Sequence, residues 1–328
     1  MLHMSSFRLL VTGGCGFIGS NFINYWLTKY PDAVVINVDR LDPCASVQNI
    51  TVTSKHYTFV VADITNTQLM LNLLRQFDIT HIVHFAAQTH VDHSFGNSLS
   101  FTQSNIVGTH SLLEAARCYG KLQRFFHMST DEVYGEIKEG SFTETSLLSP
   151  SNPYAATKAG AEFLVKSYGA SFKLPFVILR GNNVYGPHQY PEKVIPAFTM
   201  ALLKGEPMKI QGTGNALRMF IHVQDVVEGV ECVLLYGETT QTYNIGCQDQ
   251  YSVMDIAKKI HTLISPSQQF DTSIQYVEDR LFNDCRYSVD TKKIEQLGWR
   301  KKIDFEEGLQ STVQWYRDHM NNFLTGSR

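Results

Sequence analysis

The chain lacks any block of basic residues and any pair of closely spaced cysteines. Its 328 residues include 28 Lys and Arg against 31 Asp and Glu, a formal net charge of −3. Nucleic-acid-binding domains concentrate Lys and Arg on one face, so that class of function is not indicated. The six cysteines never occur as Cys-x-x-Cys, which argues against a zinc site and a disulfide framework. We therefore expect reduced thiols in a cytoplasmic protein.

Long apolar runs are also missing. No stretch approaches the roughly 20 apolar residues that span a bilayer, and residues 1–6 lead into a strand-like segment without an apolar leader. Neither a secretion signal nor a membrane anchor is therefore expected. The chain has an ordinary globular composition, with 43% hydrophobic residues. Its length suffices for one large domain or for a large and a small one.

Strands and helices alternate through the first half of the sequence. Apolar runs predict strands over residues 7–12, 34–39, 57–61, 81–85, 125–129 and 177–180, and amphipathic stretches predict helices over 17–28, 67–76, 100–119 and 153–171. This alternation predicts a doubly wound parallel α/β sheet of the Rossmann type. Beyond about residue 181, glycine- and proline-rich turns accompany helices expected over 191–204, 223–236 and 252–263. We expect a Rossmann domain over 1–180 and a smaller C-terminal α/β lobe over 181–328.

A glycine-rich turn follows the first predicted strand, with the sequence Gly13-Gly14-Cys15-Gly16-Phe17-Ile18-Gly19. It matches Gly-x-Gly-x-x-Gly between a strand and a helix, where glycines let the backbone approach a pyrophosphate and the helix N-terminus holds its charge. Asp39 ends the second strand, and a carboxylate there accepts hydrogen bonds from a ribose and repels a 2′-phosphate. NAD is therefore expected, although the neighbouring Arg40 leaves NADP open. Asp63, after the third strand, is a candidate for the adenine edge, with a helix cap as the alternative.

Two short runs carry candidate chemistry: Ser129-Thr130-Asp131-Glu132-Val133-Tyr134-Gly135 and Tyr154-Ala155-Ala156-Thr157-Lys158. Tyr154 and Lys158 share one helix face, where the ammonium could stabilise a phenolate and make the tyrosine a base near neutral pH. Asp131 and Glu132 offer one group to give a proton and one to take it, which suits elimination of water. The alternatives are a solvated helix face for Tyr154 and Lys158 and a helix cap for Asp131 and Glu132.

Four segments resemble the extended short-chain dehydrogenase/reductase family: residues 12–19, 129–135, 154–158 and 181–187. The match covers nearly the whole chain. Within that family, Thr130-Asp131-Glu132 is similar to the nucleotide-sugar 4,6-dehydratases, as are residues 85–92 and 190–196. Epimerases and decarboxylases share the glycine loop and the Tyr-Lys pair, but they need no adjacent acid and base to expel a hydroxyl. A non-catalytic NAD-binding protein is the alternative from another class, and such a protein would usually have lost the tyrosine or the lysine.

The resemblance implies an enzyme that removes water from a sugar nucleotide and recycles NAD internally. Tyr154, with Lys158 and Thr130, would take the O4 proton while C4 hydride passes to NAD. Glu132 would then remove the C5 proton, and Asp131 would protonate the departing C6 hydroxyl before the hydride returns to C6. Asp131 must therefore stay protonated near pH 7, which requires burial or repulsion by Glu132. A homodimer built on the long helices over 100–119 and 153–171 is also implied.

The resemblance assigns further residues to two binding sites. The expected NAD site consists of Gly13, Gly16, Phe17, Ile18, Gly19, Asp39, Asp63, Ile64, Phe85, Ala86, Ala87, Ser104, Tyr154 and Lys158. The expected sugar-nucleotide site consists of Thr89, Asn183, Glu192, Lys193, Val194, Lys209, Arg218, Arg286 and Tyr287. No metal site is expected, because most of the histidines at positions 81, 84, 90 and 93 would lie on a strand end or loop without a carboxylate to orient them.

The nucleotide is expected to be UDP, with dTDP as the alternative. Residues 180–187 and 282–287 are more similar to the UDP-glucose dehydratase domain of plant rhamnose synthases than to bacterial dTDP-glucose enzymes, which implies a rhamnose-type deoxysugar pathway. UDP and dTDP differ by a methyl and a hydroxyl group, which a pocket distinguishes by only about 1–3 kcal/mol unless a polar group binds one of them. Two positions depart from the family pattern. Pro43 replaces an aromatic residue, which puts stacking near the adenosine in doubt, and Leu281 replaces a proline.

Overall fold

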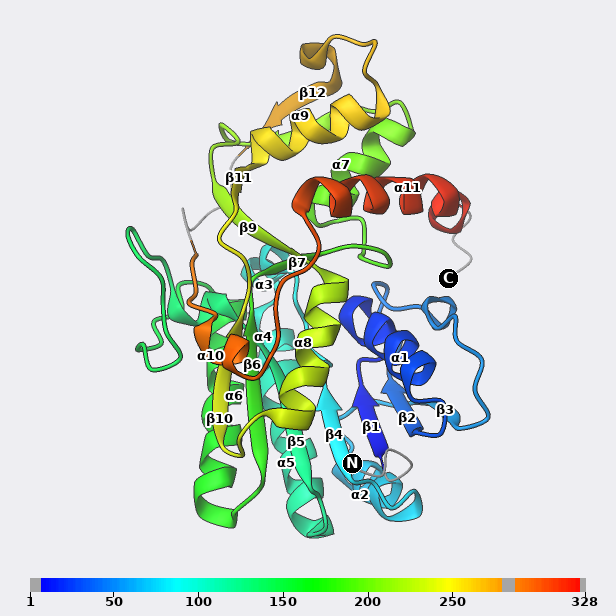
Figure 1. Cartoon of the computed structure of the whole chain (residues 1–328), viewed down its shortest axis with the longest axis vertical. Coiled ribbons are helices and arrows are strands. Elements are labelled where there is room, and N and C mark those ends of the chain that lie inside the picture. Colours follow the sequence, from blue (N-terminus) through cyan, green and yellow to red (C-terminus); the bar gives the residue numbers. More distant parts are fainter. Residues whose placement is uncertain (1–6, 279–286, 325–328) are drawn as a thin grey trace.

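The central sheet of the computed structural model contains seven parallel strands within the described residues, 7–278 and 287–324. Their order is β10-β6-β5-β4-β1-β2-β3 (Figure 1). The strands β1 to β6, which come first in the sequence, lie in the Rossmann order, so the predicted doubly wound parallel sheet is confirmed. The strand bounds are β1 (Arg8–Thr12), β2 (Val34–Asp39), β3 (Tyr57–Val61), β4 (His81–His84), β5 (Arg124–Thr130), β6 (Phe176–Gly181) and β10 (Gln241–Ile245).

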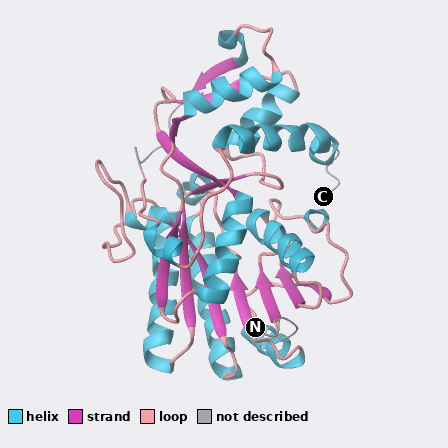
Figure 2. Cartoon of the chain, viewed as in Figure 1, coloured by secondary structure: helices cyan, strands magenta, loops and turns pink. Residues whose placement is uncertain are grey.

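Helices cover both faces of this sheet (Figure 2). Successive strand residues point to opposite sides, so Leu9 and Val11 pack on one layer of helices and Leu10 packs on the other. The first layer contains α1 (Phe17–Lys29) and α8 (Val223–Tyr236), and the second contains α2 (Thr67–Gln76), α5 (Gly108–Tyr119) and α6 (Pro153–Phe172). Burial on both faces explains why the strands are apolar at nearly every position.

A smaller lobe stands above the carboxyl ends of these strands (Figure 1). It has a three-stranded sheet, β11-β9-β7, and a two-stranded sheet, β12-β8. Phe198, Ile256 and Leu309 meet in its core. The elements are β7 (Asn183–Tyr185), α7 (Val194–Leu203), β8 (Met208–Gln211), β9 (Leu217–His222), β11 (Gln250–Ser252), α9 (Val253–Ile264), the 3-10 helix η5 (Phe270–Ser273), β12 (Ile274–Val277) and α11 (Phe305–Leu324).

The chain does not divide cleanly at residue 180. Helix α8 packs on α1, and β10 pairs in parallel with β6. Both elements therefore belong to the large lobe, although they follow residue 180 in the sequence. The short helix α10 (Lys292–Gln296) also packs beside β10. The second lobe therefore begins after β6, but the chain returns to the first.

The helix predicted over 100–119 is interrupted in the structure. It consists of α4 (Ser98–Phe101), the π-helical segment η3 (Thr102–Val107) and α5, and it follows α3 (Val91–Gly96), which the sequence pattern did not indicate. The π-helical turn places the Asn105 side chain on the backbone of Gln88, accepting from its N–H at 2.8 Å and donating to its carbonyl at 3.0 Å. Such segments are often found at functional sites. The remaining short helices are η2 (Val47–Asn49) and η4 (Asp131–Tyr134).

Across residues 7–278 and 287–324, no helix is long and apolar enough to cross a membrane.

Candidate active site

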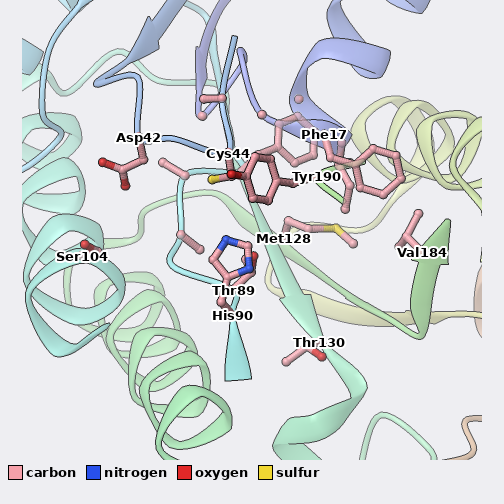
Figure 3. A pocket seen from close by; sticks show the side chains of 18 of the residues that line it. Phe17, Asp42, Cys44, Thr89, His90, Ser104, Met128, Thr130, Val184 and Tyr190 are labelled. Atoms are coloured by element: carbon pink, nitrogen blue, oxygen red, sulfur yellow. The ribbon is translucent and has the colours of Figure 1, made fainter. Parts of the chain in front are cut away.

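A pocket lies at the carboxyl ends of the parallel strands, beneath the small lobe. Every residue expected at the NAD site lines it, and so do Thr130, Asp131 and Glu132. Phe17 and Thr130 lie on opposite sides of this space (Figure 3). Parallel sheets bind ligands at this edge. The fold therefore brings the glycine loop, the acid pair and the Tyr-Lys pair into one cavity.

The turn after β1 requires glycine at two positions. Gly13 has a φ of +71°, and a Cβ there would lie 2.6 Å from the amide nitrogen of Ala86. A Cβ at Gly19 would lie 2.3 Å from the carbonyl oxygen of Gly13. The first glycine lets the loop approach the segment after β4, and the second lets α1 begin close to the strand. Helix α1 has no side-chain cap at Gly16, so its first amides keep their hydrogen-bonding capacity for a phosphate.

Asp39 and Arg40 are both held by neighbours in the protein. The Asp39 carboxylate accepts from the N–H of Cys15 at 3.0 Å and from that of Leu41 at 2.8 Å. The Arg40 guanidinium lies 2.6 Å from Asp42 and 3.0 Å from Asp63. A guanidinium that already faces two carboxylates offers little net positive charge to a 2′-phosphate, which favours NAD over NADP.

Asp63 is a turn residue rather than a cap of α2. It accepts from the N–H of Thr65 at 2.9 Å and binds Arg40, whereas the N-cap of α2 is Asn66. Burial raises the pKa of Asp63, but these hydrogen bonds outweigh it and hold that pKa below its usual value. The loop around Pro43 brings Asp42 and Cys44 to the pocket wall (Figure 3).

The acid pair follows Thr130, the last residue of β5, and opens η4. The Thr130 hydroxyl accepts from the N–H of Glu132 and donates to Oδ1 of Asp131, both at 3.3 Å. Asp131 is only 2% exposed, and its Oδ2 accepts from Nδ2 of Asn182 at 2.5 Å. Oε2 of Glu132 accepts from Nδ2 of Asn152 at 3.0 Å. Each carboxylate therefore has its own amide donor.

Burial, followed by repulsion from Glu132, raises the pKa of Asp131 to about 7. Hydrogen bonds from Asn182 and Thr130, together with the charge of Arg218, lower that pKa but do not restore its usual value. This direction is the one that an acid carrying a proton near neutral pH requires, and that role of Asp131 stays a prediction. A carboxylic acid beside a second carboxylate is the arrangement that supplies an acid and a base at one site.

Tyr154 and Lys158 lie on the pocket side of α6, as their spacing predicts. Burial first, and then the charge of Glu132, raise the pKa of the Tyr154 phenol above its usual value, against a hydrogen bond with Thr130. Burial lowers the pKa of Lys158 to about 8, and its ammonium donates to the carbonyl of Met128 at 2.6 Å. Lys158 is not among the groups that shift the pKa of Tyr154 here, so the role of Tyr154 as a base near neutral pH, supported by Lys158 and Thr130, stays a prediction. The Lys158 ammonium points to a strand carbonyl, while desolvation and the charge of Glu132 have the largest effects on the pKa of the Tyr154 phenol.

A buried ion pair supports this part of the site. Glu162 lies one turn after Lys158 on α6, and its carboxylate is 2.6 Å from the Arg180 guanidinium, with both side chains almost fully buried. The Ser129 hydroxyl donates to Glu162 at 2.6 Å, and Arg180 donates to the Tyr134 hydroxyl at 2.6 Å. Glu162 raises the pKa of Lys158 against the effect of burial, so this carboxylate helps keep the lysine charged.

The residues expected at the sugar-nucleotide site are only partly gathered. Thr89, Asn183, Glu192 and Lys193 line the pocket, and Nζ of Lys193 donates to the carbonyl of Thr89 at 2.8 Å. Glu192 contacts His90, whose imidazole also lines the pocket. This group brings one cation and one carboxylate to the side of the pocket nearest α7.

The other expected substrate residues that the structure describes are not among those that line this pocket. The Arg218 guanidinium lies 5.5 Å from the ring centroid of Tyr287, and its charge acts on Asp131. Val194 packs against the core of the small lobe, and Lys209 is exposed on β8. Neither belongs to the described pocket lining. Arg286, like Leu281, lies outside the described residues.

The histidines considered as metal ligands include two, His81 and His84, that are buried and contact threonine hydroxyls. Nδ1 of His84 lies 2.7 Å from the Thr12 hydroxyl, and its Nε2 lies 2.9 Å from the Thr109 hydroxyl. Burial lowers the pKa of His84 to about 3 and that of His81 to about 4. In the described part of the chain, no three His, Cys, Asp or Glu side chains gather in a way that could hold a metal ion.

Sequence reasoning misses the amides that hold the acid pair. Asn152-Pro153 is a recognisable helix start, because asparagine is a good N-cap and proline suits the first helical position. Nothing in that pattern shows that the same amide also reaches Glu132. Asn182 contacts Asp131 across 51 positions of sequence, and no local signal indicates this contact.

Comparison with known proteins adds independent findings. Residues 10–312 match the family model described as GDP-mannose 4,6 dehydratase. The chain belongs to this family. The family match spans both lobes, including the returning elements α8 and β10. The resemblance to the nucleotide-sugar 4,6-dehydratases is thus confirmed.

Relatives of similar identity differ in their nucleotide. The chain is 46% identical to the trifunctional UDP-glucose 4,6-dehydratase/UDP-4-keto-6-deoxy-D-glucose 3,5-epimerase/UDP-4-keto-L-rhamnose-reductase RHM3 of Arabidopsis thaliana, over 95% of this chain and 47% of the relative, so it spans about half of that protein. It is 44% identical to the dTDP-D-glucose 4,6-dehydratase of Mus musculus, over 98% of this chain and 92% of the relative. Among solved structures, DesIV, a dTDP-glucose 4,6-dehydratase from Streptomyces venezuelae with NAD and TYD bound, has a TM-score of 0.91 at 39% identity, covering 96% of this chain and 98% of DesIV.

Proposed function

We propose that this chain converts UDP-glucose to UDP-4-keto-6-deoxyglucose and water, with NAD as an internally recycled cofactor. The observation that carries the proposal is the acid pair. Asp131 is buried with its pKa raised to about 7, and it stands beside Glu132 in the cavity that also contains Tyr154 and Lys158. Epimerisation at C4 needs the tyrosine and the lysine only, whereas expelling a hydroxyl also needs an acid and a base on the same sugar.

The glycine loop and its neighbours fit NAD. The close approaches at Gly13 and Gly19 leave room that a Cβ would fill, and α1 supplies uncapped amides for the pyrophosphate. Each Asp39 oxygen has a further lone pair for a ribose hydroxyl. When bound, NAD supplies a hydride acceptor that later returns the hydride, and a positive charge that favours an ionised tyrosine.

Three side chains move protons in the proposed reaction. Tyr154, hydrogen-bonded to Thr130, accepts the proton of the O4 hydroxyl as C4 becomes a ketone. The ketone acidifies C5, so Glu132 takes the C5 proton while Asp131 gives its own proton to the C6 hydroxyl, which leaves as water. The C5–H and C6–O bonds break and a C5=C6 double bond forms. Addition of hydride at C6 and a proton at C5 then gives the 4-keto-6-deoxy sugar.

UDP-glucose is the favoured substrate because residues 180–187 resemble the plant UDP-glucose enzymes. Lys193 and Arg218 supply positive charge that a diphosphate requires, and they serve UDP and dTDP equally. The second candidate is dTDP-glucose, which the identity to the dTDP-D-glucose enzyme of Mus musculus favours. The two candidates share one reaction and differ in the uracil or thymine ring and the ribose 2′-hydroxyl.

Two further parts of the proposal concern organisation. Residues 1–180 mainly hold NAD, and residues 181–328 mainly hold the sugar nucleotide. A homodimer would cover the exposed apolar side chains of Val107 on η3 and Phe163 on α6, which are 40% and 59% exposed. These two segments pack side by side, so one face could pair with its copy as a four-helix bundle.

Mass spectrometry tests the proposed reaction directly. The purified protein is incubated with UDP-glucose and with dTDP-glucose, and loss of one water from each sugar nucleotide is followed. Faster loss from UDP-glucose supports the proposal, and faster loss from dTDP-glucose keeps the reaction but changes the substrate. Asp131→Asn and Glu132→Gln serve as controls that should abolish water loss. Conversion without a mass change would indicate an epimerase, and NAD binding without conversion of either nucleotide would contradict the proposal.

A further inference from the structure

The Asn182 side chain connects Asp131 to the backbone after β10. Asn182 directly follows β6 and is 4% exposed. Its Nδ2 donates to Oδ2 of Asp131 at 2.5 Å, and its Oδ1 accepts from the N–H of Cys247 at 3.1 Å. Its own N–H donates to the carbonyl of Ile245 at 3.1 Å. The residue is therefore fixed at both its backbone and its amide.

These contacts determine the orientation of the amide. The N–H of Cys247 can only donate, so the carbonyl end of the Asn182 side chain must face it and the NH2 end must face Asp131. A Cβ at Gly246 would lie 1.7 Å from Oδ1 of Asn182, so only glycine leaves room for the amide there. The site is thus built around one orientation of Asn182.

We propose that Asn182 is a positioning residue that places the acidic proton of Asp131 on Oδ1. This inference rests on the proposed function. Because Oδ2 accepts an N–H from Asn182, the O–H of neutral Asp131 belongs on the other oxygen. Oδ1 accepts from the Thr130 hydroxyl at 3.3 Å, but a hydroxyl, unlike the amide NH2, can also accept, so an O–H on Oδ1 keeps a partner in Thr130, which also bonds Tyr154. The proton is therefore held on the side of Asp131 that faces the rest of the catalytic cluster.

The same amide makes Asp131 a stronger acid. A hydrogen bond to a carboxylate favours its charged form, so Asn182 stabilises Asp131 after its proton has left. The charged and titratable groups that act on Asp131 are Glu132 from η4, Tyr154 from α6 and Arg218 from β9. Glu132 favours the protonated acid and Arg218 favours the carboxylate. Asn182 is the uncharged group that directly contacts the oxygen opposite the proton.

Two substitutions remove the amide donor in different ways. Asn182→Leu replaces it with a side chain of similar size, and Asn182→Asp keeps an acceptor for the N–H of Cys247. Asn244→Leu is the matched control, because Asn244 is another fully buried asparagine whose amide contacts Tyr134 and Phe142 instead. If one variant fails to fold, the other still tests the proposal.

The first readout is the titration of the Asp131 carboxyl by infrared difference spectroscopy, without sugar nucleotide, with Asp131→Asn to assign its band. Asn182→Leu should raise the titration midpoint by about one pH unit, a tenfold change in the protonation equilibrium, and Asn182→Asp, which also adds a carboxyl beside Asp131, should raise it further. The control should leave it unchanged. The second readout is absorbance at 340 nm after mixing with substrate. Oxidation at C4 should persist while elimination slows about tenfold or more, so reduced cofactor should accumulate transiently.

An unchanged midpoint in both Asn182 variants would overturn the inference, as would elimination at the wild-type rate. Failure of the proposed function would look different. A wild-type protein that removes water from neither nucleotide contradicts that proposal, yet the infrared titration still shows whether Asn182 controls the Asp131 proton.

Discussion

Replacing Asn152 should separate the stability of α6 from the chemistry of Glu132. Its Oδ1 accepts from the N–H of Ala155 at 2.8 Å and caps the helix, while its Nδ2 donates to Glu132 at 3.0 Å. Asn152→Ala removes both contacts. Asn152→Ser keeps a capping oxygen, but its side chain is too short to reach Glu132.

The expected magnitudes follow from these two hydrogen bonds. Loss of an N-cap costs about 0.5–2 kcal/mol of stability, so Asn152→Ala should lower the free energy of unfolding by that amount and Asn152→Ser should not. A hydrogen bond to a charged group contributes about 1.5–3 kcal/mol. Lost from the positioned base, this corresponds to a rate of water loss that is roughly 10- to 150-fold lower in both variants.

Urea denaturation and mass-spectrometric turnover measure the two effects independently. Ser252→Ala is the matched control, because Ser252 caps α9 by accepting from the N–H of Asp255 at 3.0 Å in the small lobe. That variant should lose stability and keep turnover. Full turnover in Asn152→Ser would refute the assignment of Asn152 as the support of Glu132.

Three further predictions follow from the charged groups. The folded pKa of Asp131, raised to about 7, lies above its unfolded value, so its stabilising contribution is complete at low pH and is lost as pH rises through 7. Asp131→Asn should therefore flatten the dependence of the urea midpoint on pH between about 4, the ordinary pKa of an aspartate side chain, and about 7, the folded pKa of Asp131, and an unchanged slope would contradict the burial argument. Arg180→Met should cost about 3–5 kcal/mol because the buried Glu162 carboxylate loses its guanidinium partner and keeps only the more distant ammonium of Lys166, at 3.5 Å. Adding Glu162→Leu should recover much of that loss in chemical denaturation; no recovery would mean that packing, not charge, dominates. Asp42→Asn should leave Arg40 paired with Asp63 alone and raise NADP affinity relative to NAD in calorimetric titrations, whereas a constant ratio would show that Asp42 does not set the preference.

Local patterns predicted the scaffold well. The glycine loop, the apolar strands and the start of α6 each follow from residues within a few positions of one another, since turn geometry and capping are local properties. Asp39 ends β2 as predicted, and Tyr154 and Lys158 share a helix face. These features place the NAD and catalytic candidates in one pocket without any knowledge of long-range contacts.

The sequence could not reveal contacts between distant segments. The donor of Asp131 is Asn182, which arrives from the end of β6, and the pKa of Tyr154 depends on desolvation that only the closed pocket creates. The π-helical turn at Asn105 is stabilised by the backbone of Gln88 on another segment. In each case the deciding partner is set by tertiary packing rather than by neighbouring residues.

The return of α8 and β10 to the large sheet has a consequence for how this protein can move and be divided. The chain crosses between the lobes repeatedly, at β6 to β7, at β9 to α8 and at β10 to β11. Several covalent connections therefore join the small lobe above the pocket to the large sheet below it, so the two lobes are not linked by a single hinge. Cutting the chain near residue 181 would leave the N-terminal fragment without β10 on the edge of its sheet. A single cut in the chain therefore does not separate the two lobes.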